Sequence, residues 1–253
     1  MSALGARITR VAAGLAAIVW TFLAADPAFA QNVTLDFGAG GEATGRIVQL
    51  IALLTILTLA PSILVMVTSF IRIVIVMSLL RTALGTQGTP PNTVIISLAL
   101  FMTFFIMQPT LQSAYEEGIV PLIAEDIDEQ EAFNRSIAPM RGFMLRHVRE
   151  KDLDLFMNMA KIETTPTPEE TPLRALIPAF MISELRRAFE IGFLLFVPFL
   201  IIDMVVASVL MSMGMMMLPP IMISLPFKLI FFVLVDGWYL VAGSLVQSFV
   251  PPS

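Results

Sequence analysis

Two long apolar stretches constrain the fold of this chain more than any other feature. They lie at 47–115 and 173–250 and consist mostly of Leu, Ile, Val, Met, Phe and Ala. Only 14% of the 253 residues are charged, against about 25% in a soluble domain, and the mean hydropathy is +0.86. A soluble protein of this size cannot cover so many apolar side chains, because too large a share of its residues lies at the surface. We therefore expect an all-α membrane protein with several spans.

The composition also excludes several classes of function. The chain has no Cys, which excludes a disulfide scaffold and thiol chemistry, and its single His cannot form a multi-His metal site. The apolar composition and the net charge of −5 exclude a nucleic-acid-binding protein. The sequence contains no phosphate-binding glycine loop and no hydrolase or metalloprotease motif. We expect no catalytic residues, no metal site and no cofactor, and thus a protein that is not an enzyme.

The amino terminus has the pattern of a secretory signal peptide. Two arginines precede an apolar run at 11–25, and a small-aromatic-small sequence ends at Ala30. We expect cleavage between Ala30 and Gln31, which makes 1–30 the signal peptide and places the mature amino terminus outside the cytoplasm. The alternative is an uncleaved first membrane helix.

The rest of the chain divides into apolar hairpins and a polar block. Each apolar stretch contains a break rich in Gly and Pro, and these residues end helices and form turns. The expected segments are a short extracytoplasmic piece at 31–46, a first hairpin at 47–115 with a break at 81–92, a polar, mostly helical extracytoplasmic block at 116–172, and a second hairpin at 173–250 with a break at 212–220.

The expected topology has four spans, with both breaks inside the cell and the polar block outside. The positive-inside rule opposes this orientation, because six basic residues lie in the polar block, but longer domains can be translocated regardless of charge. The segments 47–80 and 173–211 are longer than one straight span, since about 20 helical residues cross the lipid core. Either proline bends these segments, or part of each lies outside the lipid.

Charged residues within the apolar stretches are the most informative ones. Ionisable groups in membrane segments are costly, and they usually face a partner charge, a bundle interior or an aqueous path. Glu184 can pair with Arg187, and Arg186 with Glu190, along one helix. Three others have no such local partner, and they either pair between helices or subunits or handle ions: Asp203, Lys228 and Asp236. Arg72 is a further charge within the apolar stretches.

The second hairpin carries a run of methionines at its expected tip. Met is unbranched, flexible and polarizable, so it can pack around varied shapes. General packing and a deformable seal around a passage are both compatible with this composition. The residues are Met211, Met213, Met215, Met216 and Met217.

Three stretches, 66–92, 178–220 and 225–238, resemble the FliP family of type III protein-export membrane components. The resemblance implies a protein-conducting export gate at the base of the flagellum, in the bacterial inner membrane. It further implies a spiral, helical ring with about five copies of this chain, a head-to-tail arrangement, together with FliQ, FliR and FlhB, through which unfolded flagellar substrates pass.

The same resemblance assigns roles to particular residues. The methionines at 211–217 would form a gasket that constricts the pore, and Glu184 would form a salt bridge to Lys228 of a neighbouring copy. The family's assembly is lifted partly out of the membrane plane, so the expected spans need not all touch lipid. Two function classes follow: a non-enzymatic export-channel subunit, or an ion-coupled transporter that uses Asp203, Lys228 and Asp236.

Overall fold

The computed structural model describes residues 41–162, 167, 170–215 and 218–250. The expected cleavage site at Ala30 and Gln31 lies outside the described residues, and cleavage stays a prediction. The chain divides into two units, 1–55 and 56–253. Of the first unit, only the beginning of one helix is described.

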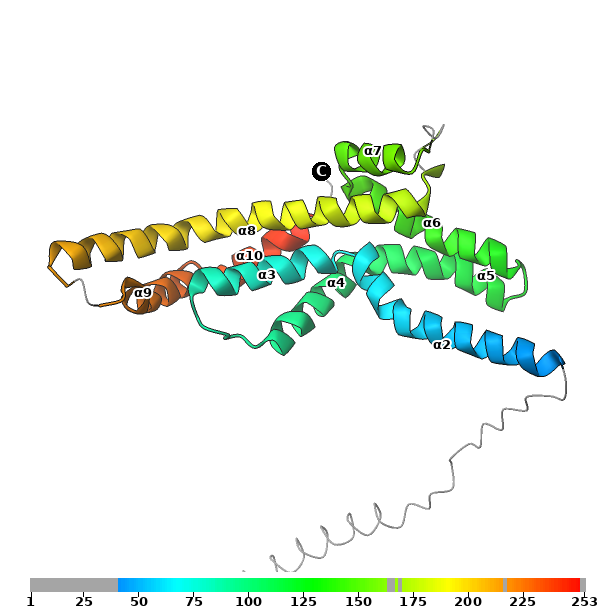
Figure 1. The fold of residues 1–253 in the computed structure, drawn as a ribbon, viewed down its shortest axis with the longest axis horizontal. Coiled ribbons are helices and arrows are strands. Elements are labelled where there is room, and N and C mark those ends of the chain that lie inside the picture. The colour runs from blue at the N-terminus through cyan, green and yellow to red at the C-terminus, as the bar shows by residue number, and fades with distance from the viewer. Residues whose placement is uncertain (1–40, 163–166, 168–169, 216–217, 251–253) are drawn as a thin grey trace, which may run out of the picture. The chain divides into compact units, whose positions relative to one another are not determined.

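The described residues form helices and no β-strand, which confirms the all-α fold for this part of the chain (Figure 1). The helices are α2 (Gly41–Val67), α3 (Phe70–Leu84), α4 (Asn92–Ala114), the π-helical turn η1 (Tyr115–Ile119), α5 (Val120–Ile123), α6 (Glu129–His147), α7 (Glu150–Met159), α8 (Leu173–Ser212), α9 (Pro220–Leu234) and α10 (Gly237–Gln247).

The first apolar segment, 47–80, is divided between two helices. α2 ends at Val67, and α3 begins at Phe70 after the buried residues Thr68 and Ser69. α3 then ends at Gly85, whose left-handed φ of 75° suits a residue without Cβ. The break at Ser69 divides 47–80 into two helices, and this accounts for its excessive length.

The second apolar segment contains a single helix of 40 residues, α8, which packs against α3. Gly192 allows the close approach of the two helices: a Cβ added there would lie 2.3 Å from Cδ1 of Leu79. Pro198, one of the prolines expected to bend these segments, lies inside α8, and the helix continues past it.

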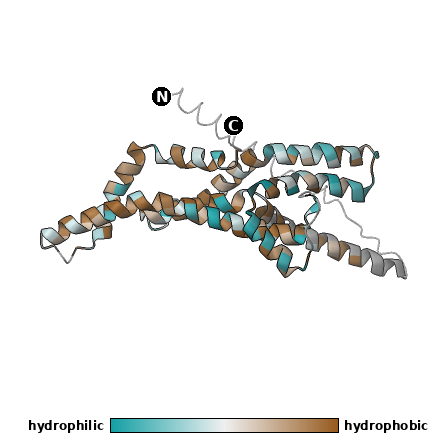
Figure 2. Ribbon diagram, turned by 90° about the horizontal axis from the view of Figure 1, so that it is seen from above, coloured by the Kyte–Doolittle hydropathy of each residue, from teal (hydrophilic) through white to brown (hydrophobic). Residues whose placement is uncertain are grey.

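The polar block folds as helices, as expected, with bounds that differ from the predicted pattern at 139–160. α6 already begins at Glu129, because the Asp128 side chain accepts a hydrogen bond of 2.8 Å from the Glu131 backbone N–H. Val148 and Arg149 are extended and separate α6 from α7. Figure 2 shows the hydrophilic residues concentrated in helices at one end of the fold.

The structure supports two or three membrane spans, and the four spans predicted from sequence are not found among the described residues. Asn92–Ile123 and Leu173–Ser212 are each long and apolar enough to cross a membrane. α9 and α10 would make a third span only as a pair bent by 62°. In the predicted first span, 47–80, α2 contributes only a short apolar helix, Leu50–Leu59, among the described residues, and α3 has 15 residues. The first of these spans also continues past the predicted hairpin end at 115.

Candidate functional site: buried ion pairs and the methionine-rich tip

The most deeply buried charges of the described chain form one ion pair between α3 and α8. Arg72 and Glu184 both have side chains with 0% exposure. Nε of Arg72 donates to Oε2 of Glu184 at 2.8 Å, and Nη2 donates to Oε1. This two-pronged contact matches the planar guanidinium to the carboxylate, which is the strongest geometry for such a pair.

The carboxyl-terminal end of the described chain closes over this pair. Nη1 of Arg72 donates to the side-chain oxygen of Ser248 at 2.9 Å and to its carbonyl at 3.2 Å. The guanidinium carbon lies 3.7 Å from the centre of the Phe249 ring, within the range of a cation–π contact. Arg72 therefore fastens the end of α10 to α3 and α8.

His147 packs beside the same aromatic ring. Its ring centre lies 4.6 Å from that of Phe143 and 5.2 Å from that of Phe249. Its Nδ1 is 3.0 Å from the Phe143 carbonyl oxygen and can donate to it. Burial lowers the pKa of His147, and the positive charges of Arg72 and Arg146 lower it further. His147 is therefore a buried histidine packed between two aromatic rings.

A second buried polar contact joins α8 to α7 at Ser183, one residue before Glu184. The hydroxyl of Ser183 donates to Asp152 at 2.7 Å, and Arg149 makes a two-pronged contact with the same carboxylate at 2.7 and 2.8 Å. Burial alone would raise the pKa of Asp152, but the hydrogen bonds from Ser183 and Arg149 outweigh it and the pKa is lowered. Sequence analysis missed this contact, because its only signal is the local spacing of Arg149 and Asp152.

A third set of charges joins α8 to α9. Nζ of Lys228 lies 2.6 Å from Oδ2 of Asp203 and donates to the Ala83 carbonyl at 3.1 Å. The hydroxyl of Ser224 donates to the other oxygen of Asp203 at 2.5 Å. Lys228 is 4% exposed. Pairing between helices, one of the two alternatives for these charges, is thus realised within the chain for Asp203 and Lys228.

Asp236 lies apart from these three sets of charges. It has left-handed backbone angles, φ 50° and ψ 53°, at the bend between α9 and α10. It is exposed and forms no ion pair with any residue that the structure describes. The three charges considered for ion handling are therefore not gathered into one site.

The predicted pair of Glu184 with Lys228 is not formed within the chain, where each residue has another partner. The prediction concerned neighbouring copies, so it stays a prediction. Arg186 and Glu190, in contrast, form the predicted local pair at 2.7 Å on the surface of α8.

The methionine-rich segment lies between α8 and α9, at the end of the hairpin (Figure 1). Met211, Met213 and Met215 are 60%, 62% and 43% exposed. Met216 and Met217 lie outside the described residues. Gly214 has φ 74°, so the chain turns there without a Cβ clash. The three described methionines therefore have apolar side chains that the described chain leaves largely exposed.

Comparison with known proteins identifies the family. The sequence profile of the FliP family matches residues 53–245. The chain is 59% identical to a flagellar biosynthetic protein FliP of Caulobacter vibrioides, over 93% of this chain and 88% of that protein. It is 57% identical to that of Bacillus subtilis, over 82% and 94%, and 50% identical to that of Aquifex aeolicus, over 92% and 98%.

These matches cover most of both chains and include the ion pairs and the described methionines. No group of three or more potential metal-ligating side chains is found among the described residues. The family profile and the relatives show that the chain belongs to the FliP family of flagellar biosynthetic proteins, and by this membership it is a non-enzymatic component of the flagellar export apparatus.

Proposed function

We propose that several copies of this chain line the protein-conducting passage of the flagellar export gate in the bacterial inner membrane, at the flagellar basal body. The observation that carries this proposal is the exposed methionine-rich tip at the end of the 40-residue helix α8. By family resemblance, the partners are FliQ, FliR and FlhB, and the cargo is unfolded flagellar protein. The chain would form two hairpins around an extracytoplasmic block, in a helical ring of about five copies.

An export gate has to retain ions and small solutes and still admit an unfolded chain. Thioether side chains have several rotatable bonds and no strong hydrogen-bonding group, so they can close on one another and repack around a passing chain. An apolar constriction also resists ion flow by excluding water. The exposure of Met211, Met213 and Met215 leaves them free to meet the same residues of other copies.

The buried charges support a structural role over ion transport. Asp203 and Lys228 hold α8 and α9 together, and Glu184 holds α3 against α8. A transporter site usually gathers its polar groups between broken helices near the membrane midplane. α8 is unbroken where it carries Glu184 and Asp203, so the geometry favours the export-channel subunit over the transporter.

The test replaces Met215, Met216 and Met217 together with Ala and measures ion conductance through the assembled, resting gate. We expect a ring of normal size with raised resting conductance. Ala at the exposed Met159, in the polar block and away from the tip, should leave conductance unchanged. An assembled triple-Ala ring with wild-type conductance would refute the seal and return these residues to ordinary packing.

A further inference from the structure

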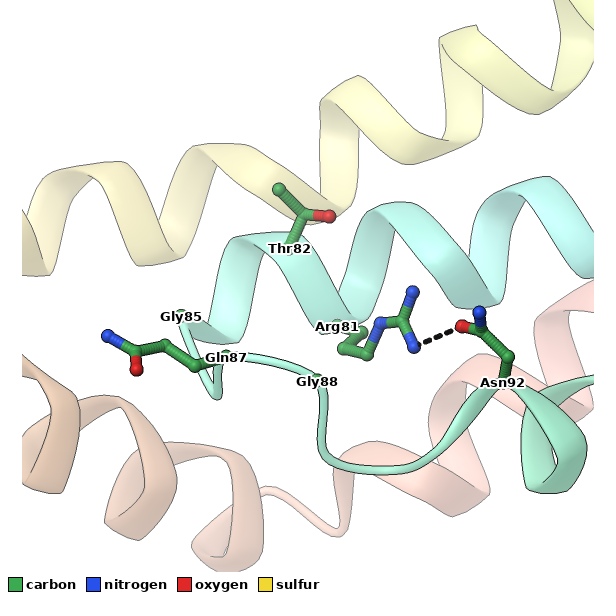
Figure 3. A pocket seen from close by; sticks show the side chains of 6 residues that line it. All are labelled: Arg81, Thr82, Gly85, Gln87, Gly88 and Asn92. Carbon is green, nitrogen blue, oxygen red and sulfur yellow. Dashed lines mark hydrogen bonds between the residues drawn. The ribbon is translucent and has the colours of Figure 1, made fainter.

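The loop between α3 and α4 borders a pocket of about 550 Å³. Figure 3 shows its lining residues: Arg81 and Asn92 face each other, whereas Gln87 points away from them. The lining also includes Thr82 and two glycines of the loop. None of the lining residues carries a negative charge.

The Arg81 side chain is held in place on one side and is free on the other. Its Nη1 donates to the Pro90 carbonyl at 3.1 Å and to Oδ1 of Asn92 at 2.6 Å. Within the described residues, Nε and Nη2 have no hydrogen-bond partner, and no carboxylate forms an ion pair with this guanidinium. The free edge, Nε and Nη2, is the one that binds two oxygens of a phosphate or carboxylate at once.

A second, mostly apolar pocket of about 430 Å³ is lined by the same loop and by α9. The two pockets share Gly85 and Gln87. α9 supplies the apolar lining of the second pocket, and two of these side chains, Ile221 and Met222, are 64% and 56% exposed. The apolar lining consists of Ile221, Met222, Leu225 and Leu229.

A fixed cation beside an uncovered apolar groove fits a ligand that has an anionic head and an apolar tail. We propose that Arg81 binds the phosphate of an anionic phospholipid, whose acyl chain lies along the α9 groove. Basic pockets between membrane helices bind such headgroups. This site is independent of the proposed pore, because it shares no residue with the methionine-rich tip.

Lipid is favoured over free phosphate because of the neighbouring groove. A small inorganic anion would use only the polar pocket and would leave the α9 side chains exposed to water. A carboxylate of a protein partner could also bind Arg81. The residues that line the groove carry no charge, so they would add no further charged contact to such a partner.

The experiment titrates purified full-length chain in detergent with phosphatidylglycerol or phosphatidylcholine and counts bound lipids by native mass spectrometry. We expect preferential retention of phosphatidylglycerol and its loss in R81Q. The expected reduction in affinity is about fivefold, which corresponds to the roughly 1 kcal/mol that one basic side chain contributes near an anionic lipid surface. R135Q is the matched control, because Arg135 is an exposed arginine paired with Glu131 in the polar block.

R81K separates binding from folding. Lysine keeps the positive charge but lacks the planar guanidinium that binds two oxygens at once. We therefore expect R81K to retain phosphatidylglycerol less than the wild type and more than R81Q, whether or not R81Q is stably folded. Equal retention of both lipids, or wild-type retention by R81K and R81Q, would overturn the proposal. Displacement of the lipid by an equal concentration of inorganic phosphate would instead identify a free-phosphate site. Loss of a co-purifying protein in R81Q, with lipid retention unchanged, would identify a protein contact.

Discussion

Removal of Glu184 tests the central pair of the fold. In the Glu184→Ala variant, the Arg72 guanidinium stays fully buried and keeps Ser248 as its only hydrogen-bond partner among the described residues. Breaking a buried ion pair by removing one partner costs about 3–5 kcal/mol, because the remaining charge is uncompensated. We expect a loss of this size in the free energy of unfolding, measured by denaturant titration of the purified chain in detergent.

Glu190→Ala is the control on the same helix. Glu190 pairs with Arg186 at the surface, where both side chains are more than half exposed. Exposed pairs contribute little to stability, since water already solvates both groups. We expect no measurable change in unfolding for this variant. Equal effects of Glu184→Ala and Glu190→Ala would refute the assignment of Glu184 to a buried pair.

The double variant Arg72→Met/Glu184→Leu should recover much of the loss, because apolar side chains of similar volume can replace a buried pair at little cost. The alternative partner, Lys228 of a neighbouring copy, is tested by exchanging the charges of Glu184 and Lys228. Restored ring assembly in that exchange, measured by the size of the purified complex, would support the pair between copies. Strictly additive effects of the Arg72 and Glu184 substitutions would refute the pair within the chain.

Three further changes test other parts of the structure. Gly192→Ala should cost about 1–3 kcal/mol in the free energy of unfolding, because its Cβ would overlap Leu79, and Leu79→Ala should relieve part of the cost. The pKa of His147 lies below its ordinary 6.5 in the folded chain, so the unfolded chain binds more protons, and the free energy of unfolding should fall as the pH drops below about 6.5. The urea midpoint measured against pH should show this fall, and His147→Phe should remove it. Asp236→Val should cost roughly 1–2 kcal/mol in thermal unfolding, whereas Asp236→Gly should not, because the left-handed backbone disfavours a β-branched side chain.

The sequence was sufficient for the features that depend on local chemistry. The helical class follows from hydropathy, and the loop after Gly85 and the turn at Gly214 lie within the breaks marked by Gly and Pro. The Arg186–Glu190 pair follows from helical spacing. Each of these depends on residues close together in the chain.

The partner of Glu184 could not be predicted in the same way. Arg187 is a local candidate with suitable spacing, but the actual partner is Arg72, 112 positions away. Helical spacing gives no information about which of several distant cations is brought near by tertiary packing. The break at Ser69 was missed for a related reason, since the apolar pattern continues through it without a Gly or Pro.

The buried residues of α8 are unevenly distributed, and this asymmetry relates the fold to the proposed function. Eight of its ten buried residues lie between Ala175 and Gly192, where the contacts from Asp152, Arg72 and Leu79 converge. In the remaining twenty positions, only Phe199 and Leu210 are buried. The first half is therefore fixed by its own chain, whereas the second half presents apolar side chains that other copies can cover. A deformable seal needs a rigid base and an uncovered tip, so substitutions at the buried residues of the first half should impair folding, and those at the methionines should change conductance in a chain that still folds.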